Sequence, residues 1–300
     1  MKKHLRTAVA IAILIVTAAA FAYYVKNHPE TLDQLRGMPP TIIIVLLAIN
    51  AVGFLSYMFV TRGSLRVYGK HLSLQENILF NAYSSLINFF GPGQSGPIFR
   101  GAYLKKRHDL PVKKFMFITL IYLAFYAIIS AMFMLIGSRP WWQTAVVMLL
   151  VGAACFVLVR RYKQGSKIDT GHGLNPKTLG WILAATAVQV SSFAVLYGVE
   201  LRQISPDVSV GQILSYTGVS NFTLFVALTP GAIGIREAFL VFSQNLHHIN
   251  NTTIVAANIL DRAVYLLFLG LLFIMVISLH AKDKLNISQL KLNTKQKDPS

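Results

Sequence analysis

The sequence predicts an all-α polytopic membrane protein with six full spans and two re-entrant helical hairpins, arranged as an inverted-topology repeat. Of its 300 residues, 54% are hydrophobic and 13% are charged, whereas a soluble domain is roughly 25% charged. Apolar runs of roughly 18 residues or more recur along the chain, and each can cross about 30 Å of hydrocarbon. Two further apolar regions, 78–104 and 212–248, are interrupted near their middles by Pro and Gly. This pattern excludes a soluble globular protein.

Six uninterrupted apolar segments are predicted to be full spans. The first follows Lys2, Lys3 and Arg6, and Ala20-Phe21-Ala22 resembles a signal-peptidase site. Its apolar stretch is longer than that of a usual signal peptide, so we expect an uncleaved span. The single cysteine, Cys155, excludes an internal disulfide framework. The predicted spans are 7–25, 41–60, 115–137, 142–159, 178–198 and 252–279.

The positions of the basic residues distinguish hairpins from full crossings. Lys and Arg outnumber Asp and Glu by 28 to 11, and cytoplasmic loops carry the positive excess in membrane proteins. If both interrupted regions return to the side from which they enter, the inside segments hold 3, 3, 6, 5 and 5 basic residues, which is 22 of the 28. If both regions cross fully, each side holds 13 and the bias disappears. Two hairpins with both termini in the cytoplasm are therefore predicted, in a plasma or inner membrane.

The two interruptions share a sequence pattern. Pro92-Gly93-Gln94-Ser95-Gly96 and Pro230-Gly231-Ala232-Ile233-Gly234 both match P-G-x-x-G, and an Arg follows each, at Arg100 and Arg236. In the predicted topology the first hairpin enters from the cytoplasm and the second from outside. Interrupted helices at corresponding places of an inverted repeat indicate a transport site near the bilayer midplane. We expect repeat 1 at about 41–137 and repeat 2 at about 178–279.

The chemistry of such tips favours an anion. Pro92 and Pro230 end a helix, while Gly93, Gly96, Gly231 and Gly234 allow a tight reversal. The helix that follows begins with free N–H groups and the positive end of its dipole, which suit a phosphate. The alternative is that these residues only let helices pack closely.

Four charged residues are predicted within the membrane, where a charge costs at least about 2.5–3.5 kcal/mol. They are Arg236, Glu237, Asp261 and Arg262, and their charges sum to zero. We expect ion pairs between the second hairpin and the last span, for example Glu237 with Arg262. Such pairs would serve a binding site or lock the hairpin structurally. Arg100 is either a site residue or an interfacial one.

The sequence also predicts the nature of the chain ends, cofactors and partners. Residues 1–280 are expected to form one membrane domain, and the polar, basic residues 281–300 a disordered cytoplasmic tail. Residues 91–96 match G-x-G-x-x-G but lack the strand context of a dinucleotide site, so no cofactor or metal is expected. The expected partners are membrane lipids with anionic head groups, and not nucleic acid.

Residues 230–238 carry a resemblance to a known family. Pro230 through Ala238 is similar to the P-G-G-x-G-x-R-E-A signature of the lysylphosphatidylglycerol synthase transmembrane-region family, whose members are also called flippase-like integral membrane proteins. Asn88 through Leu104 resembles an earlier motif of that family, and Arg262 occupies the place of an Arg common in its last span. The resemblance covers about 40–280 and implies a polytopic lipid-handling membrane protein.

Two features depart from the family pattern. Pro97 stands where the family usually has an acidic residue, and 117–123 lacks the charges often found there. Members that synthesise lysylphosphatidylglycerol carry a soluble aminoacyltransferase domain, for which the residues after 280 are too few. We therefore expect no lysyltransferase activity.

These observations predict a flippase-like transporter that binds an anionic phospholipid or polyprenyl-phosphate head group between the two hairpin tips. Arg236, Arg262 and Arg100 would hold the phosphate, and Glu237 and Asp261 would orient the arginines or couple protons. The alternatives are a membrane-embedded lipid-linked transferase, an accessory subunit of a separate enzyme, and an ion or small-solute transporter.

Overall fold

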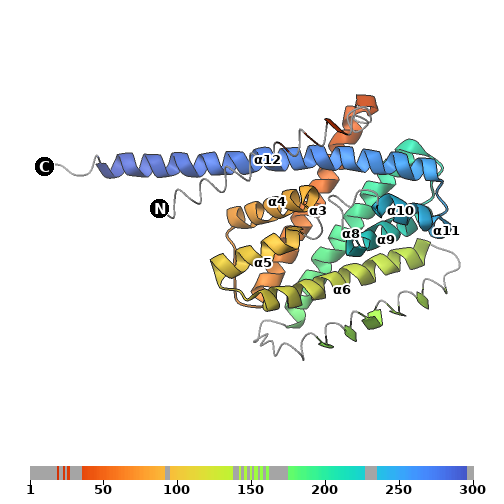
Figure 1. Cartoon of the computed structure of the whole chain (residues 1–300), viewed down its shortest axis with the longest axis horizontal. Coiled ribbons are helices and arrows are strands. Elements are labelled where there is room, and N and C mark those ends of the chain that lie inside the picture. The colour runs from red at the N-terminus through yellow and green to blue at the C-terminus, as the bar shows by residue number, and fades with distance from the viewer. Residues whose placement is uncertain are drawn as a thin grey trace.

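The computed structural model describes residues 36–91, 95–137, 175–226 and 235–295, together with isolated positions between 19 and 27 and between 142 and 161. Every element in these four ranges is an α-helix (Figure 1). In chain order they are α3 (Pro40–Arg66), α4 (Leu74–Phe90), α5 (Ser95–His108), α6 (Val112–Gly137), α8 (Pro176–Ile204), α9 (Val210–Val226), α10 (Ile235–Phe242), α11 (Gln244–His247) and α12 (Asn251–Lys295).

Four of these helices are long and apolar enough to cross a membrane: α3, α6, α8 and the first 30 residues of α12. They contain the predicted spans 41–60, 115–137, 178–198 and 252–279, which confirms a multi-pass all-α membrane protein. The two other predicted spans, 7–25 and 142–159, fall outside the described residues apart from isolated positions.

Local signals set where several helices begin. Ser73 caps α4 by accepting a hydrogen bond from the Glu76 N–H, at 3.1 Å. Asn175 caps α8 in the same way through the Thr178 N–H, at 2.8 Å, and Pro176 follows at the first helical position. A polar cap satisfies an N–H that has no partner inside the helix, and Pro lacks an N–H to satisfy.

Helices α4 and α5 form an antiparallel hairpin. At its closed end the Ser95 hydroxyl donates to the Ile87 carbonyl at 2.8 Å, and at its open end the Tyr103 hydroxyl donates to Glu76 at 2.6 Å. The 17 residues of α4 rise about 25 Å at 1.5 Å per residue, which is less than the roughly 30 Å of a bilayer core. The second hairpin, α9 and α10, has legs of 17 and 8 residues. These lengths agree with the predicted re-entrant hairpins, whose depth in a membrane stays a prediction.

Close antiparallel contacts between helices join the two halves of the chain. Along α3 and α8, Gly53 lies beside Ser192, whereas Gly63, further along α3, lies beside Trp181, which is earlier in α8. Along α6 and α9, the Tyr126 hydroxyl donates to Asn221 at 2.9 Å, and Gly137 lies against Gly211. Both pairs of helices therefore run in opposite directions, and small residues allow their backbones to approach closely.

The helix contacts keep the same pattern when the two halves are exchanged. Helices α3, α4, α5 and α6 correspond to α8, α9, α10 and α12. Under this correspondence the α6–α9 contact matches α12–α4, the α3–α6 contact matches α8–α12, and the α5–α6 contact matches α10–α12. All six contacts occur in the structure. Since α3 and its counterpart α8 are antiparallel, the halves also have opposite directions. This is the packing that an inverted repeat requires.

The basic residues of the described helices gather at one end of the bundle. The C-terminal ends of α3 and α5 and the N-terminal ends of α6 and α8 meet there, where the Tyr68 hydroxyl donates to the Lys114 carbonyl at 3.0 Å. The opposite end carries Arg36 and Arg202. This asymmetry is what the predicted topology requires, although which end faces the cytoplasm stays a prediction. The basic end carries Arg62, Arg66, Lys70, Lys105, Lys106, Arg107, Lys113, Lys114 and Lys177.

The C-terminal segment differs from its prediction. The sequence predicts a disordered tail over 281–300, whereas α12 continues as a helix to Lys295 and extends well past the rest of the bundle (Figure 1). Its 45 residues rise about 68 Å at 1.5 Å per residue. A continuous helix leaves every interior N–H and C=O satisfied, even where few apolar side chains are present to drive packing.

The contact between α6 and α9 supplies a test of the packing. A methyl group at Gly218 would lie 2.5 Å from the Ser130 carbonyl oxygen and would overlap Met134, whereas one at Gly180 in α8 meets nothing within 4 Å. We expect Gly218→Ala to destabilise the purified protein by about 1–3 kcal/mol through overpacking. The measurement is the midpoint of thermal unfolding in detergent, followed by tryptophan fluorescence.

The matched control is Gly180→Ala, which replaces glycine within a helix and introduces no contact, so its midpoint should equal or exceed that of the unsubstituted protein. Equal midpoints for the two variants would contradict the close α6–α9 contact.

Candidate functional site

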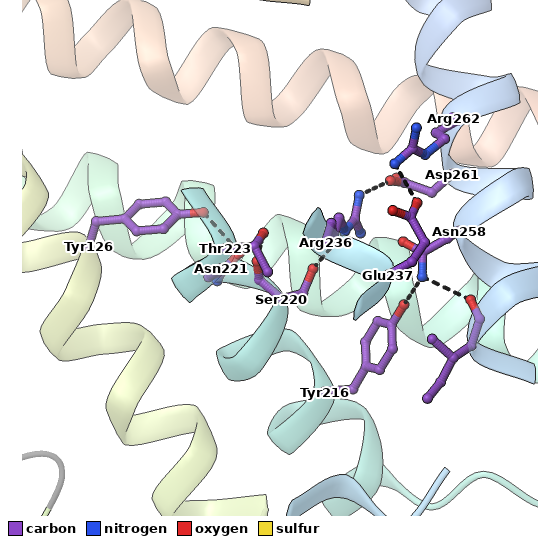
Figure 2. A network of polar contacts seen from close by, with 11 residues as sticks. Tyr126, Tyr216, Ser220, Asn221, Thr223, Arg236, Glu237, Asn258, Asp261 and Arg262 are labelled. Carbon is purple, nitrogen blue, oxygen red and sulfur yellow. Dashed lines mark hydrogen bonds and ion pairs between the residues drawn. The ribbon is translucent and has the colours of Figure 1, made fainter. Parts of the chain in front are cut away.

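Two ion pairs connect the second hairpin to the last span. Arg236 and Glu237 are neighbours on α10, and Asp261 and Arg262 are neighbours on α12. Arg236 pairs with Asp261, and Arg262 pairs with Glu237 (Figure 2). The predicted pair of Glu237 with Arg262 is thus confirmed. The four charges cancel, which is the arrangement that a low-dielectric environment favours.

Arg236 lies where several helices meet. Its Nε donates to the Ser220 hydroxyl of α9 at 3.1 Å, and its guanidinium lies 5.1 Å from the centre of the Tyr197 ring of α8. The neighbouring Asn221 accepts a hydrogen bond from Tyr126 of α6 (Figure 2). Polar contacts therefore join α6, α8, α9, α10 and α12 around one arginine.

Each arginine of these pairs has one buried N–H group that forms no hydrogen bond in the described structure. In the part of the chain that the structure describes, Arg236 Nη2 and Arg262 Nε are buried and have no hydrogen-bond partner. Buried polar groups in proteins nearly always have a partner, so an unpaired donor calls for an explanation.

Arg100 of the first hairpin has a different environment. It is 6% exposed and thus buried within the bundle, while its depth in the membrane stays a prediction. Its Nη2 donates to the Thr61 hydroxyl at 3.1 Å and also to Asn81 Oδ1. Both acceptors are uncharged, and Arg100 Nε has no partner among the described residues.

The carboxylate of Glu76 forms hydrogen bonds at the open end of the same hairpin. It accepts hydrogen bonds from Tyr103 and His108, and Arg107 lies 3.6 Å away. Burial alone would raise the pKa of Glu76, but these hydrogen bonds outweigh burial and lower the pKa below its ordinary value. This carboxylate therefore closes the hairpin between α4 and α5 and forms no ion pair with Arg100.

A row of aromatic rings lies between Arg100 and the second hairpin. The Arg100 guanidinium lies 4.0 Å from the centre of the Tyr57 ring. Tyr57 is 5.6 Å from Tyr122, and Tyr122 is 5.9 Å from Tyr126, between ring centres. Tyr126 reaches Asn221, beside Ser220, which binds Arg236. The predicted site residues thus occupy two separate centres that the tyrosines connect, and Arg100 has no direct contact with Arg236 or Arg262 among the described contacts.

Glu200 is a buried acid that the sequence analysis missed. It lies two residues beyond the end of the predicted span 178–198, was therefore assigned to a loop, and is 1% exposed in α8. Its Oε1 has no hydrogen-bond partner among the described residues, and it interacts electrostatically with Asp261 and Arg236. An acid within the apolar run that precedes Arg202 was the available signal.

The predicted helix-breaking residues are mostly not described. Gly96 is described, and a methyl group there would lie 2.8 Å from both Asn88 and the Ser84 carbonyl, so this glycine allows α4 and α5 to approach. Its N–H is already bonded to Asn88 Oδ1 at 3.2 Å. The contact favours the packing role for Gly96. The other predicted positions, Pro92, Gly93, Pro230, Gly231 and Gly234, lie outside the described residues.

Removing one partner of an ion pair should be costly, because the other charge stays buried. Arg236 and Asp261 have side chains 13% and 12% exposed, and breaking such a buried pair typically costs about 3–5 kcal/mol. We expect Arg236→Gln and Asp261→Asn each to lower the free energy of unfolding by that amount, and the double variant to recover most of it. The measurement is a double-mutant cycle on detergent-solubilised protein. Additive losses in the double variant would contradict the pairing.

Glu200 offers a matched comparison for Asp261. Glu200 has no cation within ion-pair distance among the described residues, and a buried charge without a close partner is costly. We expect Glu200→Gln, which keeps the size of the side chain, to leave the unfolding midpoint unchanged or raise it, while Asp261→Asn lowers it. A loss for Glu200→Gln as large as that for Asp261→Asn would show that Glu200 has a partner.

The site can now be set beside known proteins. No curated protein matches the chain at the similarity required. The family model described as lysylphosphatidylglycerol synthase TM region matches residues 7–272, which include α3, α6, α8, both hairpins and the first part of α12. This match covers most of the 300 residues. The chain therefore belongs to the lysylphosphatidylglycerol synthase transmembrane-region family.

Proposed function

We propose that the protein is a flippase-like lipid transporter that binds the anionic head group of a phospholipid or polyprenyl phosphate. The observation that carries this proposal is a shared property of Arg100, Arg236 and Arg262. Each is buried or nearly so in a chain with four membrane-length helices, and each has a buried N–H donor without a partner in the described structure.

An anion would accept hydrogen bonds from the unused donors and, at Arg100, would also compensate the charge. A guanidinium is always charged and presents its donors in a planar fork that matches phosphate oxygens. Within a membrane such a charge is costly and marks substrate pathways. Arg236 and Arg262 already have carboxylate partners. A phosphate would therefore bind there by sharing or exchanging those arginines, with Asp261 and Glu237 as the internal counterions.

The arrangement of the halves supplies a route for movement. The α3–α8 and α6–α9 contacts form the boundary between the two halves, and both are antiparallel packings of long helices. Rocking of one half against the other around a fixed site is how inverted repeats achieve alternating access. In this protein the tyrosine row lies along that boundary, between Arg100 and the second hairpin.

Head-group translocation in proteoliposomes tests the proposal. The assay compares a fluorescent anionic phospholipid with a fluorescent zwitterionic one. We expect the reconstituted protein to accelerate movement of the anionic lipid between leaflets. Arg236→Ala and Arg262→Ala should each reduce that rate at least tenfold, because each removes a guanidinium that donates hydrogen bonds to the phosphate. Lys177→Ala, which removes an exposed charge at the start of α8, should keep the rate.

Other results would contradict the proposal. Wild-type translocation rates in Arg236→Ala and Arg262→Ala variants that insert and purify normally would remove these residues from the site. Solute flux without lipid movement would favour a small-solute transporter, and formation of a modified lipid by the purified protein from a labelled donor would favour a transferase.

A further inference from the structure

Arg100 is a buried cation held by neutral groups. Its guanidinium lies 4.0 Å from the centre of the Tyr57 ring and 5.1 Å from that of Phe80. Its hydrogen-bond acceptors are the Thr61 hydroxyl and the Asn81 amide oxygen. Asn81 is itself fixed by donating to the backbone and side-chain oxygens of Asn77, both at 2.7 Å. The guanidinium is thereby oriented, while its charge is left without a counterion.

Within the described ranges, no carboxylate lies within ion-pair distance of Arg100. The nearest acid in the hairpin sequence, Glu76, is bound to Tyr103 and His108 at the open end. The two buried arginines of the second hairpin provide the contrast, because each has a carboxylate partner. The fold therefore gives Arg236 and Arg262 a carboxylate each and leaves Arg100 without one among the described residues.

A pocket opens beside Arg100. Its cavity volume is about 30 Å³, and it is open on one side, between α3, α4, α5 and α6. Ser64, Thr119 and Tyr122 line the pocket, together with Tyr57 and Phe80. The Thr119 hydroxyl donates to the Phe115 carbonyl at 2.8 Å and the Tyr122 hydroxyl donates to Gln189 at 3.1 Å, so of these three hydroxyls Ser64 is the donor left for a ligand. Arg100 is also a lining residue, and its Nε has no hydrogen-bond partner among the described groups. An arginine, a serine hydroxyl and apolar walls are components of a site for an oxyanion.

The pocket lies toward the basic end of the bundle. Ser64 and Leu65 are at the end of α3, and Phe115 and Thr119 are in the first turns of α6. Leu65 is followed by Arg66, and Phe115 is preceded by Lys113 and Lys114. Such a concentration of one sign of charge draws anions toward the pocket.

From these observations we infer that the Arg100 pocket is a binding site for a phosphate group, either inorganic or as a phosphate ester, distinct from the Arg236 and Arg262 centre. A bound phosphate supplies the missing counterion and accepts hydrogen bonds from Arg100 Nε and the Ser64 hydroxyl. That the phosphate belongs to a transported lipid rests on the proposed function; the binding itself does not.

The test measures binding to the full-length protein in a neutral detergent at constant ionic strength. The probes are inorganic phosphate and short-chain phosphatidylglycerol, which are anionic. Short-chain phosphatidylcholine, which is zwitterionic, serves as the comparison. Titrations followed by the unfolding midpoint and by equilibrium binding should show saturable binding of the two anionic probes. Phosphatidylglycerol binding without phosphate binding would assign the site to lipid head groups, and binding of both supports the shared chemistry.

Two substitutions separate a binding role from a structural one. Arg100→Gln removes the charge, and we expect at least tenfold weaker binding of phosphate and phosphatidylglycerol. Asn81→Asp keeps Arg100 and places a carboxylate on it at the position of the present amide oxygen, so it should also abolish binding by supplying an internal counterion. Because Asn81→Asp loses the donors to Asn77, its folded state is checked by size-exclusion profile.

Arg66→Gln is the matched control. It removes the same charge from the same end, but Arg66 lies 5.7 Å from the Trp181 ring and does not line the pocket. Binding should stay within about twofold of the unsubstituted protein. Unchanged affinity in a folded Arg100→Gln or Asn81→Asp protein would overturn the inference, as would the absence of saturable binding by either anionic probe. Normal binding with no lipid translocation would overturn the proposed function and leave this site standing.

Discussion

The ion pairs between α10 and α12 are the interaction on which the second half of the molecule depends. A charge removed from water needs an opposite charge close by, together with hydrogen bonds for its remaining donors and acceptors. Arg236 and Glu237 meet this need by pairing with Asp261 and Arg262. Because α10 has eight residues, it is too short to form a stable isolated helix. These pairs and the Ser220 and Tyr197 contacts hold it against the bundle together with Leu240, which is fully buried in the hydrophobic core.

The first half uses the same helix arrangement with different chemistry. Its hairpin is held by hydrogen bonds at both ends and by the close approach that Gly96 permits. Its buried arginine contacts two rings and two neutral acceptors in place of carboxylates. The two halves are therefore alike in packing and unlike in charge compensation.

The sequence alone predicts the parts of this fold that follow from hydropathy and charge counting. The four described spans lie where long apolar runs place them, and the cancelling charges of the second hairpin predicted the pair of Glu237 with Arg262. The burial of Arg100 was not predictable in this way, because it depends on Thr61, Asn81 and two rings from other helices. Glu200 was missed since it lies just past a span boundary estimated from hydropathy, and hydropathy does not report how far a helix continues into a packed bundle.

The length of α12 has a mechanical consequence. The same uninterrupted helix carries Asp261 and Arg262 near its beginning and continues to Lys295, well beyond the bundle (Figure 1). In a straight helix the hydrogen-bonded backbone resists bending, so a tilt at one end moves the other end through a larger arc. A small change at the Arg236 and Glu237 contacts would therefore act on a lever, with the displacement amplified at the far, lysine-bearing end of the helix.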